Sequence, residues 1–227
     1  MIFNKVTHCI FDMDGLLIDS ESVYDQIIGS IAEQFGKDFT LEVKLKMLGL
    51  TERDTAIVAI REMDLPVTNE EFLKIYREKV RQGQLHPKLM PGVQELIKHL
   101  YKNDVPMAVA TSSSQTAVDL KTKDHQHVFK MFQHIVCGSS DPDVANGKPA
   151  PDIFLVAARR FADSPHPSKC LVFEDAPNGI VGAAEAGMQS VMVPDPQVNA
   201  ELRKQATLVL NSLTAFKPEL FGLPRFE

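Results

Sequence analysis

Short apolar runs alternate with amphipathic segments over most of the chain. An apolar run of strand length predicts a buried strand, and apolar positions three and four residues apart predict a helix packed on it. The predicted strands are Val6–Phe11, Val105–Ala110, Ile135–Cys137, Cys170–Phe173, Ser190–Val193 and Thr207–Leu210. The predicted helices between them are Gly92–Lys102, a segment after Thr111, Val128–Phe132, Pro151–Phe161, Asn178–Ala186 and Val198–Gln205. Because strands that alternate with helices form parallel sheets, the pattern predicts an α/β fold with a doubly wound parallel sheet.

One segment breaks this alternation. Residues 20–87 contain no convincing strand, and apolar side chains such as Val23, Ile27 and Ile31 recur there at helical spacing. The first predicted helix runs from Ser20 to Gly36 and the second from Thr40 to Gly49. The third is Thr55–Met63, preceded by an N-terminal cap at Thr51, and the fourth begins at a capping box of Thr68 and Glu71 and runs toward Gln84. These four helices predict a small domain, residues 20–87, inserted into an α/β core of residues 1–19 and 88–227.

Composition narrows the classes of function. The chain has 227 residues, 44% of them hydrophobic, and a net charge of −6. It has no Lys/Arg-rich run and no apolar stretch of membrane-spanning length, so neither nucleic acid nor a membrane is an expected partner. The N-terminal residues lead directly into the first strand, which leaves no room for a signal peptide. The three cysteines lie in apolar runs, which predicts reduced thiols and a cytoplasmic location.

Asp12 and Asp14 follow the first predicted strand with one residue between them. On an extended backbone, residues i and i+2 point to the same side, so the two carboxylates are expected to face one site. Gly15 then lets the chain turn away. Carboxylates that share a site repel each other and favour a bound cation, and oxygen ligands favour Mg²⁺. Taken alone, an Asp-x-Asp pair is also common in ordinary loops, so a metal site is favoured only if other strand ends carry matching polar residues.

Ligands of an open α/β sheet bind beyond the carboxyl ends of its strands, and three further strand ends carry polar residues. Thr111 and Ser112 precede a helix, where a hydroxyl and free N–H groups suit either a phosphate oxygen or an ordinary helix cap. Lys148 lies in a Pro-rich loop. Its ammonium could be held in place to bind a phosphoryl group, or the residue could be a solvated surface lysine. Glu174 and Asp175 form a second acidic pair, of which one should bind the metal ion and the other lie in its outer shell or have a structural role. Alternatively, Asp175 only caps the helix that follows.

Together these motifs resemble those of the haloacid dehalogenase superfamily of phosphohydrolases, in the subgroup with a helical cap after the first strand. The motifs are Asp12-Met13-Asp14-Gly15, Val109-Ala110-Thr111-Ser112-Ser113, Gly147-Lys148-Pro149-Ala150-Pro151-Asp152 and Glu174-Asp175. The resemblance covers essentially the whole chain. It implies a Rossmann-like core whose loops meet in one catalytic site.

The resemblance also implies a two-step phosphoryl transfer. In this reaction Asp12 attacks phosphorus and forms an aspartyl-phosphate. Asp14 protonates the leaving alcohol and then takes a proton from the attacking water. The implied ligands of Mg²⁺ are the Asp12 carboxylate, the Asp14 backbone carbonyl and the Asp175 carboxylate, with Glu174 in the outer shell.

The implied phosphate-binding groups are Thr111, the Ser112 backbone and Lys148, which would hold the oxygens of the transferring group. Lys148 is thereby also a catalytic residue. The helical cap would close over the site and select the substrate, with the segments Gly49–Asp54 and Phe72–Gln84 deciding specificity.

Two other functions compete with a phosphatase. Sugar-phosphate mutases of the same subgroup carry a His ten residues after the second Asp and an Arg in the cap loop. Here these positions hold Tyr24 and Glu52, with Arg53 one place on, and both departures count against a mutase. A phospho-accepting signalling domain needs neither an acid two residues from its nucleophile nor a domain-sized cap, and this chain has both.

Within the family, whole-chain resemblance favours pseudouridine 5′-phosphate as the substrate. The resemblance is carried by the stretches Thr7–Leu17, Lys169–Gly179, Leu208–Leu213 and Pro218–Pro224. Nucleotide, glycerol and sugar phosphates stay open as alternatives. We therefore expect a Mg²⁺-dependent phosphomonoester hydrolase that acts on a small phosphorylated metabolite and is a monomer or a weak dimer.

Overall fold

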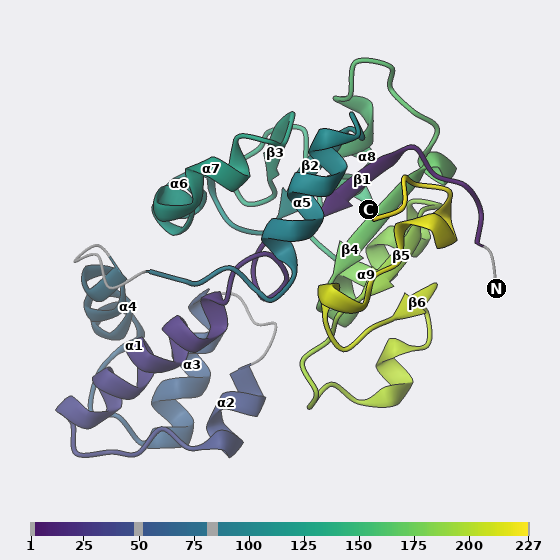
Figure 1. The fold of residues 1–227 in the computed structure, drawn as a ribbon. Helices are drawn as coiled ribbons and strands as arrows, with labels where there is room; N and C mark the ends of the chain where they lie inside the picture. The colour runs from purple at the N-terminus through teal and green to yellow at the C-terminus, as the bar shows by residue number, and fades with distance from the viewer. Residues whose placement is uncertain (1–2, 48–51, 81–85, 227) are drawn as a thin grey trace. The chain divides into compact units, whose positions relative to one another are not determined.

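The apolar runs of the sequence form a parallel sheet in the computed structural model, which describes residues 3–47, 52–80 and 86–226 (Figure 1). Within these residues the sheet has six strands in the order β3-β2-β1-β4-β5-β6. The strands are β1 His8–Phe11, β2 Met107–Thr111, β3 His134–Cys137, β4 Cys170–Glu174, β5 Gln189–Met192 and β6 Leu208–Val209. Each neighbouring pair runs parallel, which confirms the predicted fold class.

Helices cover both faces of this sheet. They are α5 Val93–Lys102, α6 Gln115–Thr122, α7 Gln126–Phe129, α8 Asp152–Arg159 and α9 Pro177–Glu185. Successive residues of β1 point to opposite faces, so Phe11 joins a hydrophobic core with Leu96 of α5, and Ile10 joins a second core with Ile153 of α8. A strand buried on both sides is mostly apolar, which is why the sequence pattern located β1.

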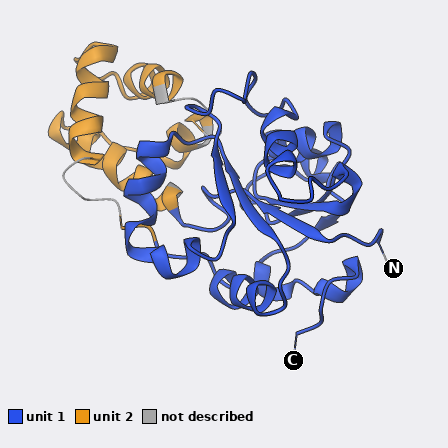
Figure 2. Cartoon of the chain, turned by 90° about the horizontal axis from the view of Figure 1, so that it is seen from above, with its two compact units in different colours: residues 1–19, 88–227 blue, residues 20–87 orange. Residues whose placement is uncertain are grey.

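The chain separates into two compact units, one of residues 1–19 and 88–227 and one of residues 20–87 (Figure 2). Within its described residues the second unit has four helices, α1 Ser20–Gln34, α2 Leu41–Met47, α3 Glu52–Met63 and α4 Asn69–Lys79. Their apolar faces form a separate core that includes Ile31 and Phe72. The predicted helix limits at Gly49, Thr51 and Gln84 lie outside the described residues.

The capping box predicted at the start of α4 is confirmed. Thr68 Oγ1 accepts a hydrogen bond from the Glu71 N–H at 3.2 Å, and Glu71 Oε2 accepts one from the Thr68 N–H at 2.8 Å. The two bonds satisfy donors that would be left unpaired at a helix N-terminus.

One predicted helix is wrong. In place of an α-helix over Val198–Gln205 the structure has a short 3-10 helix, Ala200–Arg203. An α-helix would pair the Val198 carbonyl with the Leu202 N–H. In the structure this carbonyl accepts a hydrogen bond from the guanidinium of Arg203 at 2.8 Å. The Leu202 N–H instead donates to the carbonyl of Asn199.

The register of the central strands brings the candidate loops together. Phe11 of β1 is paired with Val109 of β2 and with Phe173 of β4. The next residues, Asp12 and Glu174, therefore leave the sheet side by side at its carboxyl edge. This is the edge where ligands of α/β sheets bind.

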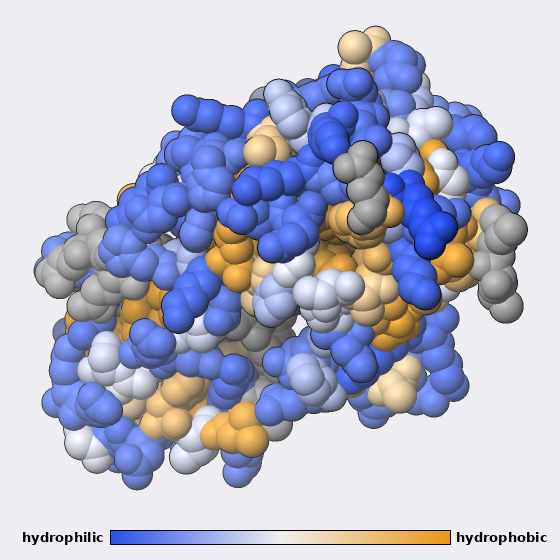
Figure 3. Space-filling view, viewed as in Figure 1, coloured by the Kyte–Doolittle hydropathy of each residue, from blue (hydrophilic) through white to orange (hydrophobic). Residues whose placement is uncertain are grey.

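The outer face drawn in Figure 3 is mainly hydrophilic, with separate smaller apolar patches. Exposed apolar side chains include Leu41, Ile57 and Tyr101. Among the described residues, none of the helices combines the length and the apolar character needed to cross a bilayer.

Candidate active site

Asp12 stands directly after β1, between the ends of β2 and β4. Its N–H donates to the carbonyl of Phe173 at 2.9 Å, and its Oδ1 accepts a hydrogen bond from Lys148 Nζ at 2.5 Å. Burial raises the pKa of Asp12 to about 7; Lys148 opposes the rise, and the carboxylates of Glu174 and Asp14 add to it. Positive charge beside Asp12 would therefore favour the ionised form that a nucleophile needs.

Lys148 enters the site from the loop between β3 and α8, and its side chain is only 7% exposed. Besides Asp12, Nζ donates to the carbonyl of Ala110 at 3.1 Å and to Glu174 Oε1 at 2.8 Å. Burial alone would lower the pKa of Lys148, but the carboxylates of Asp12 and Glu174 outweigh it and hold the pKa above its usual value. Lys148 is therefore not a solvated surface lysine, and its ammonium stays charged among the ends of β1, β2 and β4.

Glu174 ends β4 and is 1% exposed. Its Oε2 accepts hydrogen bonds from the N–H groups of Asp175 and Ala176 at 2.8 and 2.7 Å, while its Oε1 accepts from Lys148. Gly179 of α9 leaves the space for this carboxylate, because a Cβ there would lie 1.7 Å from Oε1. Both oxygens of Glu174 are thus held by hydrogen bonds from fixed donors.

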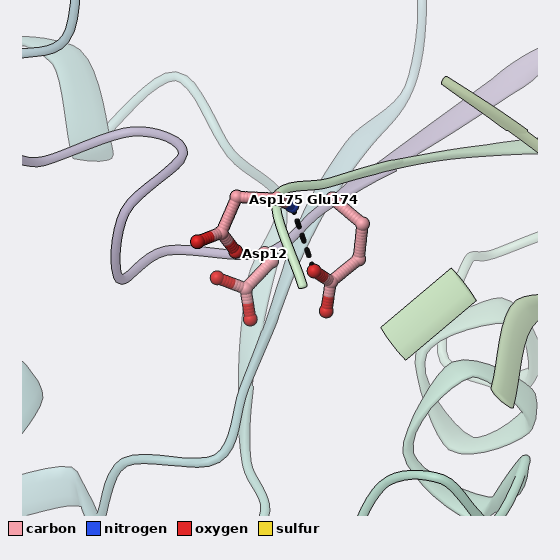
Figure 4. A group of neighbouring side chains, drawn as sticks. All are labelled: Asp12, Glu174 and Asp175. Atoms are coloured by element: carbon pink, nitrogen blue, oxygen red, sulfur yellow. Dashed lines mark hydrogen bonds between the residues drawn. The ribbon is translucent and has the colours of Figure 1, made fainter. Parts of the chain in front are cut away.

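Asp12, Glu174 and Asp175 gather at the ends of β1 and β4 (Figure 4). Each offers a carboxylate oxygen, and these oxygens all lie within 4.8 Å of one another, so the group could hold a metal ion. Gly15, at φ +83°, allows the close approach of Asp175, since a Cβ on residue 15 would lie 2.3 Å from Asp175 Oδ2. An all-oxygen donor set of this kind suits a hard divalent cation.

Asp14 makes a second set of contacts. Its Oδ2 accepts hydrogen bonds from the hydroxyls of Ser113 and Thr111 at 2.8 and 3.3 Å. Its Oδ1 accepts a hydrogen bond from Lys121 Nζ at 2.6 Å, and the same Nζ donates to Ser113 Oγ at 2.9 Å. Although Asp12 and Asp14 are two residues apart, each carboxylate therefore pairs with a different lysine.

The remaining predicted residues lie around this second cluster. Thr111, at the end of β2, is buried, and its Oγ1 accepts a hydrogen bond from the Ser113 N–H at 3.1 Å. Ser112 is exposed, and its carbonyl accepts a hydrogen bond from the Ser139 hydroxyl at 2.5 Å. The roles of both residues toward a phosphate stay predictions.

Sequence reasoning missed Ser113 and Lys121 as residues of the site. Ser113 lies in the same run of hydroxyl residues as Thr111, so its position was a usable signal. Lys121 is three residues beyond Val118, on the buried face of α6, and helical spacing would have placed it there. A lysine on the apolar face of a helix was the signal that went unused.

Comparison with known proteins relates this chain to hydrolases and phosphatases of one family. A family model described as "Haloacid dehalogenase-like hydrolase" matches residues 9–193. A Drosophila melanogaster protein named "Probable pseudouridine-5'-phosphatase" is 50% identical over 99% of this chain and 97% of its own length. An Arabidopsis thaliana protein named "(DL)-glycerol-3-phosphatase 2" is 45% identical over 98% of this chain and 94% of its own. A solved structure of a putative beta-phosphoglucomutase from Thermotoga maritima superposes with a TM-score of 0.76 at 28% identity, covering 90% of this chain and 94% of the other.

Proposed function

This chain belongs to the haloacid dehalogenase-like hydrolase family and is a phosphomonoester hydrolase, and we propose that its substrate is pseudouridine 5′-phosphate and its cofactor Mg²⁺. The observation that carries the chemistry is the buried contact of Lys148 with both Asp12 and Glu174, beside Asp175. It joins a nucleophile, a fixed cation and a group of metal-binding oxygens at one edge of the sheet. These are the parts that phosphoryl transfer requires.

The reaction proceeds in two displacements on phosphorus. A carboxylate oxygen of Asp12 attacks, the bond from phosphorus to the ester oxygen breaks, and the alcohol takes a proton from Asp14. Water then attacks the aspartyl-phosphate and gives a proton to Asp14, which releases inorganic phosphate and restores Asp12. Lys148 holds a phosphoryl oxygen in both displacements, assisted by Thr111 and the backbone of Ser112.

The metal site in this proposal consists of the Asp12 and Asp175 carboxylates and the Asp14 backbone carbonyl. Glu174 supports it from the outer shell, because both of its oxygens already accept hydrogen bonds from Lys148 and from backbone N–H groups. When bound, Mg²⁺ would supply the positive charge that allows an anionic carboxylate to approach an anionic phosphate.

Pseudouridine 5′-phosphate is supported by the 50% identity to the Drosophila relative over nearly the full length of both chains. Glycerol 3-phosphate is the second candidate, because the Arabidopsis relative is 45% identical over a similar span. As part of the same proposal, the three buried free cysteines support a cytoplasmic location.

The deciding experiment measures phosphate release with Mg²⁺ from pseudouridine 5′-phosphate, uridine 5′-phosphate, glycerol 3-phosphate and glucose 1-phosphate. We expect the highest kcat/KM for pseudouridine 5′-phosphate. Equal cleavage of uridine 5′-phosphate would refute the narrow assignment, and faster cleavage of glycerol 3-phosphate would favour the second candidate. Conversion of glucose 1-phosphate to its 6-phosphate without release of phosphate would instead indicate a mutase.

Two variants connect any activity to the site. Asp12→Asn should lose it, whereas Asp38→Asn, a change to an exposed aspartate outside the site, should keep it. Phosphate release that survives Asp12→Asn would have to come from other chemistry or from a contaminant.

A further inference from the structure

Lys121 is a buried lysine to which the proposed reaction gives no role. Its side chain is 4% exposed, and it lies in the last turn of α6 beside Val118 and Thr122, which are also buried. Burial of an ammonium is costly, and an apolar side chain of similar length would fill the same space without that cost. Because a buried ion pair contributes little net stability, the charge at this position calls for another explanation.

The contacts of Lys121 form a closed ring with Asp14 and Ser113. Lys121 Nζ donates to Asp14 Oδ1 at 2.6 Å and to Ser113 Oγ at 2.9 Å, and Ser113 Oγ donates to Asp14 Oδ2 at 2.8 Å. The ring fixes both the position of the Asp14 carboxylate and its rotation about the Cβ–Cγ bond. One oxygen of Asp12, Oδ1, likewise accepts a hydrogen bond from a lysine, Lys148, at 2.5 Å.

We propose that Lys121 is a positioning residue that holds the Asp14 carboxylate in the orientation for proton exchange with the leaving alcohol and with water. The proposal rests on the proposed phosphatase reaction, in which Asp14 carries that proton. General acid–base catalysis depends on the distance and direction between the carboxylate and the reacting oxygen. Asp14 is 28% exposed, so without the charged contact on Oδ1 its carboxylate has room to turn toward water.

The proposal predicts an effect that depends on the leaving group. Alkyl phosphates release an alkoxide that must be protonated as it departs, whereas p-nitrophenyl phosphate releases a stabilised phenolate that departs without a proton. Lys121→Met should therefore lower kcat/KM for pseudouridine 5′-phosphate and glycerol 3-phosphate by about 10²-fold, the cost of a misplaced catalytic group. For p-nitrophenyl phosphate the loss should stay within about threefold, because the attack by Asp12 is unchanged.

Further variants separate positioning from structure. Lys121→Arg keeps a cation and should recover part of the loss on alkyl phosphates. In an Asp14→Asn background, Lys121→Met should have almost no additional effect, because the residue through which it acts is already gone. Lys123→Met replaces an exposed lysine two residues away and should behave as wild type. If Lys121→Met does not fold, the same rate ratio is measured on Lys121→Gln.

Several results would overturn the proposal. They are an equal loss on alkyl and aryl phosphates, a rise in KM at unchanged kcat, an effect that adds fully to that of Asp14→Asn, or faster cleavage of the alkyl phosphates. Failure of the proposed function itself looks different. In that case the wild type releases phosphate from none of these esters, or Asp12→Asn retains the activity.

Discussion

Gly179→Ala is a small substitution for which we expect a large effect. In an ordinary helix this change stabilises a protein by about 0.5–1 kcal/mol, because alanine loses less backbone freedom on folding. Gly179 lies in α9, but a Cβ there would be 1.7 Å from Glu174 Oε1 and 2.6 Å from Glu174 Cγ. Real Cβ contacts are not found below 3.0 Å, so Oε1 would have to move by at least 1.3 Å, the difference between 3.0 and 1.7 Å.

That movement is costly because Glu174 is held in place. The carboxylate is 1% exposed and accepts hydrogen bonds from Lys148 and from the N–H groups of Asp175 and Ala176. A hydrogen bond to a charged group contributes about 1.5–3 kcal/mol, so the loss of two of them costs roughly 3–6 kcal/mol. After subtraction of about 1 kcal/mol of helix propensity, the net destabilisation is about 2–5 kcal/mol.

Urea unfolding of purified Gly179→Ala measures this loss, and phosphate release should fall with it because Lys148 loses one of its two carboxylate partners. Gly29→Ala is the matched control, since Gly29 lies in α1 and the nearest atoms to a Cβ there are Phe39 carbons at 3.9 Å. We expect the control to be as stable as wild type or slightly more stable. In a Glu174→Ala background the clash is gone, so Gly179→Ala should then be neutral or stabilising. Wild-type stability of Gly179→Ala, or an undiminished loss in that background, would refute the reasoning.

Three further predictions follow from the same edge of the sheet and from β3. Asp12→Asn keeps the side-chain volume but removes the attacking oxygen, so phosphate release should vanish while circular dichroism stays native; substantial residual turnover would argue against covalent catalysis. Asp175→Ala should sharply raise the Mg²⁺ concentration needed for half-maximal activity, and an unchanged titration would remove Asp175 from the ligand set. Burial lowers the pKa of His134, whose ring contacts the carbonyl of Ala157 at 2.9 Å, below its usual 6.5. As the pH falls below about 6.5 the unfolded chain therefore binds the proton first, and stability should fall. His134→Gln should flatten this part of the urea-unfolding profile, and an equal slope in both proteins would contradict the assignment.

The fold was predictable where local pattern and tertiary environment agree. A strand such as β1 is buried on both faces, so its sequence is mostly apolar, and the pattern could locate it. The capping box of Thr68 and Glu71 depends on residues three apart and was equally accessible. The helix expected over Val198–Gln205 is wrong because the Leu202 N–H pairs three residues back, with the carbonyl of Asn199, in a short 3-10 helix, and the apolar spacing did not distinguish that turn from an α-helix.

Of the candidate site, only the residues that end or directly follow a strand could be placed from the sequence. Asp12, Thr111 and Glu174 leave neighbouring parallel strands, so the sheet rule alone places them at one edge. Lys148 reaches that edge from a loop, and its burial between two carboxylates could not be distinguished in the sequence from exposure to solvent. Lys121 comes from the side of a helix, and only three-dimensional packing turns it toward Asp14.

These differences matter because the fold does not decide the reaction. The solved structure described as a putative beta-phosphoglucomutase superposes with a TM-score of 0.76, so the fold alone does not separate a hydrolase from a mutase. Both reactions would begin with the same attack by Asp12 and would differ in whether water or a second alcohol takes the phosphoryl group. In the proposed mechanism that choice would depend on which oxygen the Asp14 carboxylate can deprotonate, and hence on what holds Asp14 in place. Lys121 contacts the Asp14 carboxylate, whereas Lys148 contacts that of Asp12, so replacement of Lys121 would test the proposed proton transfer separately from the proposed nucleophile.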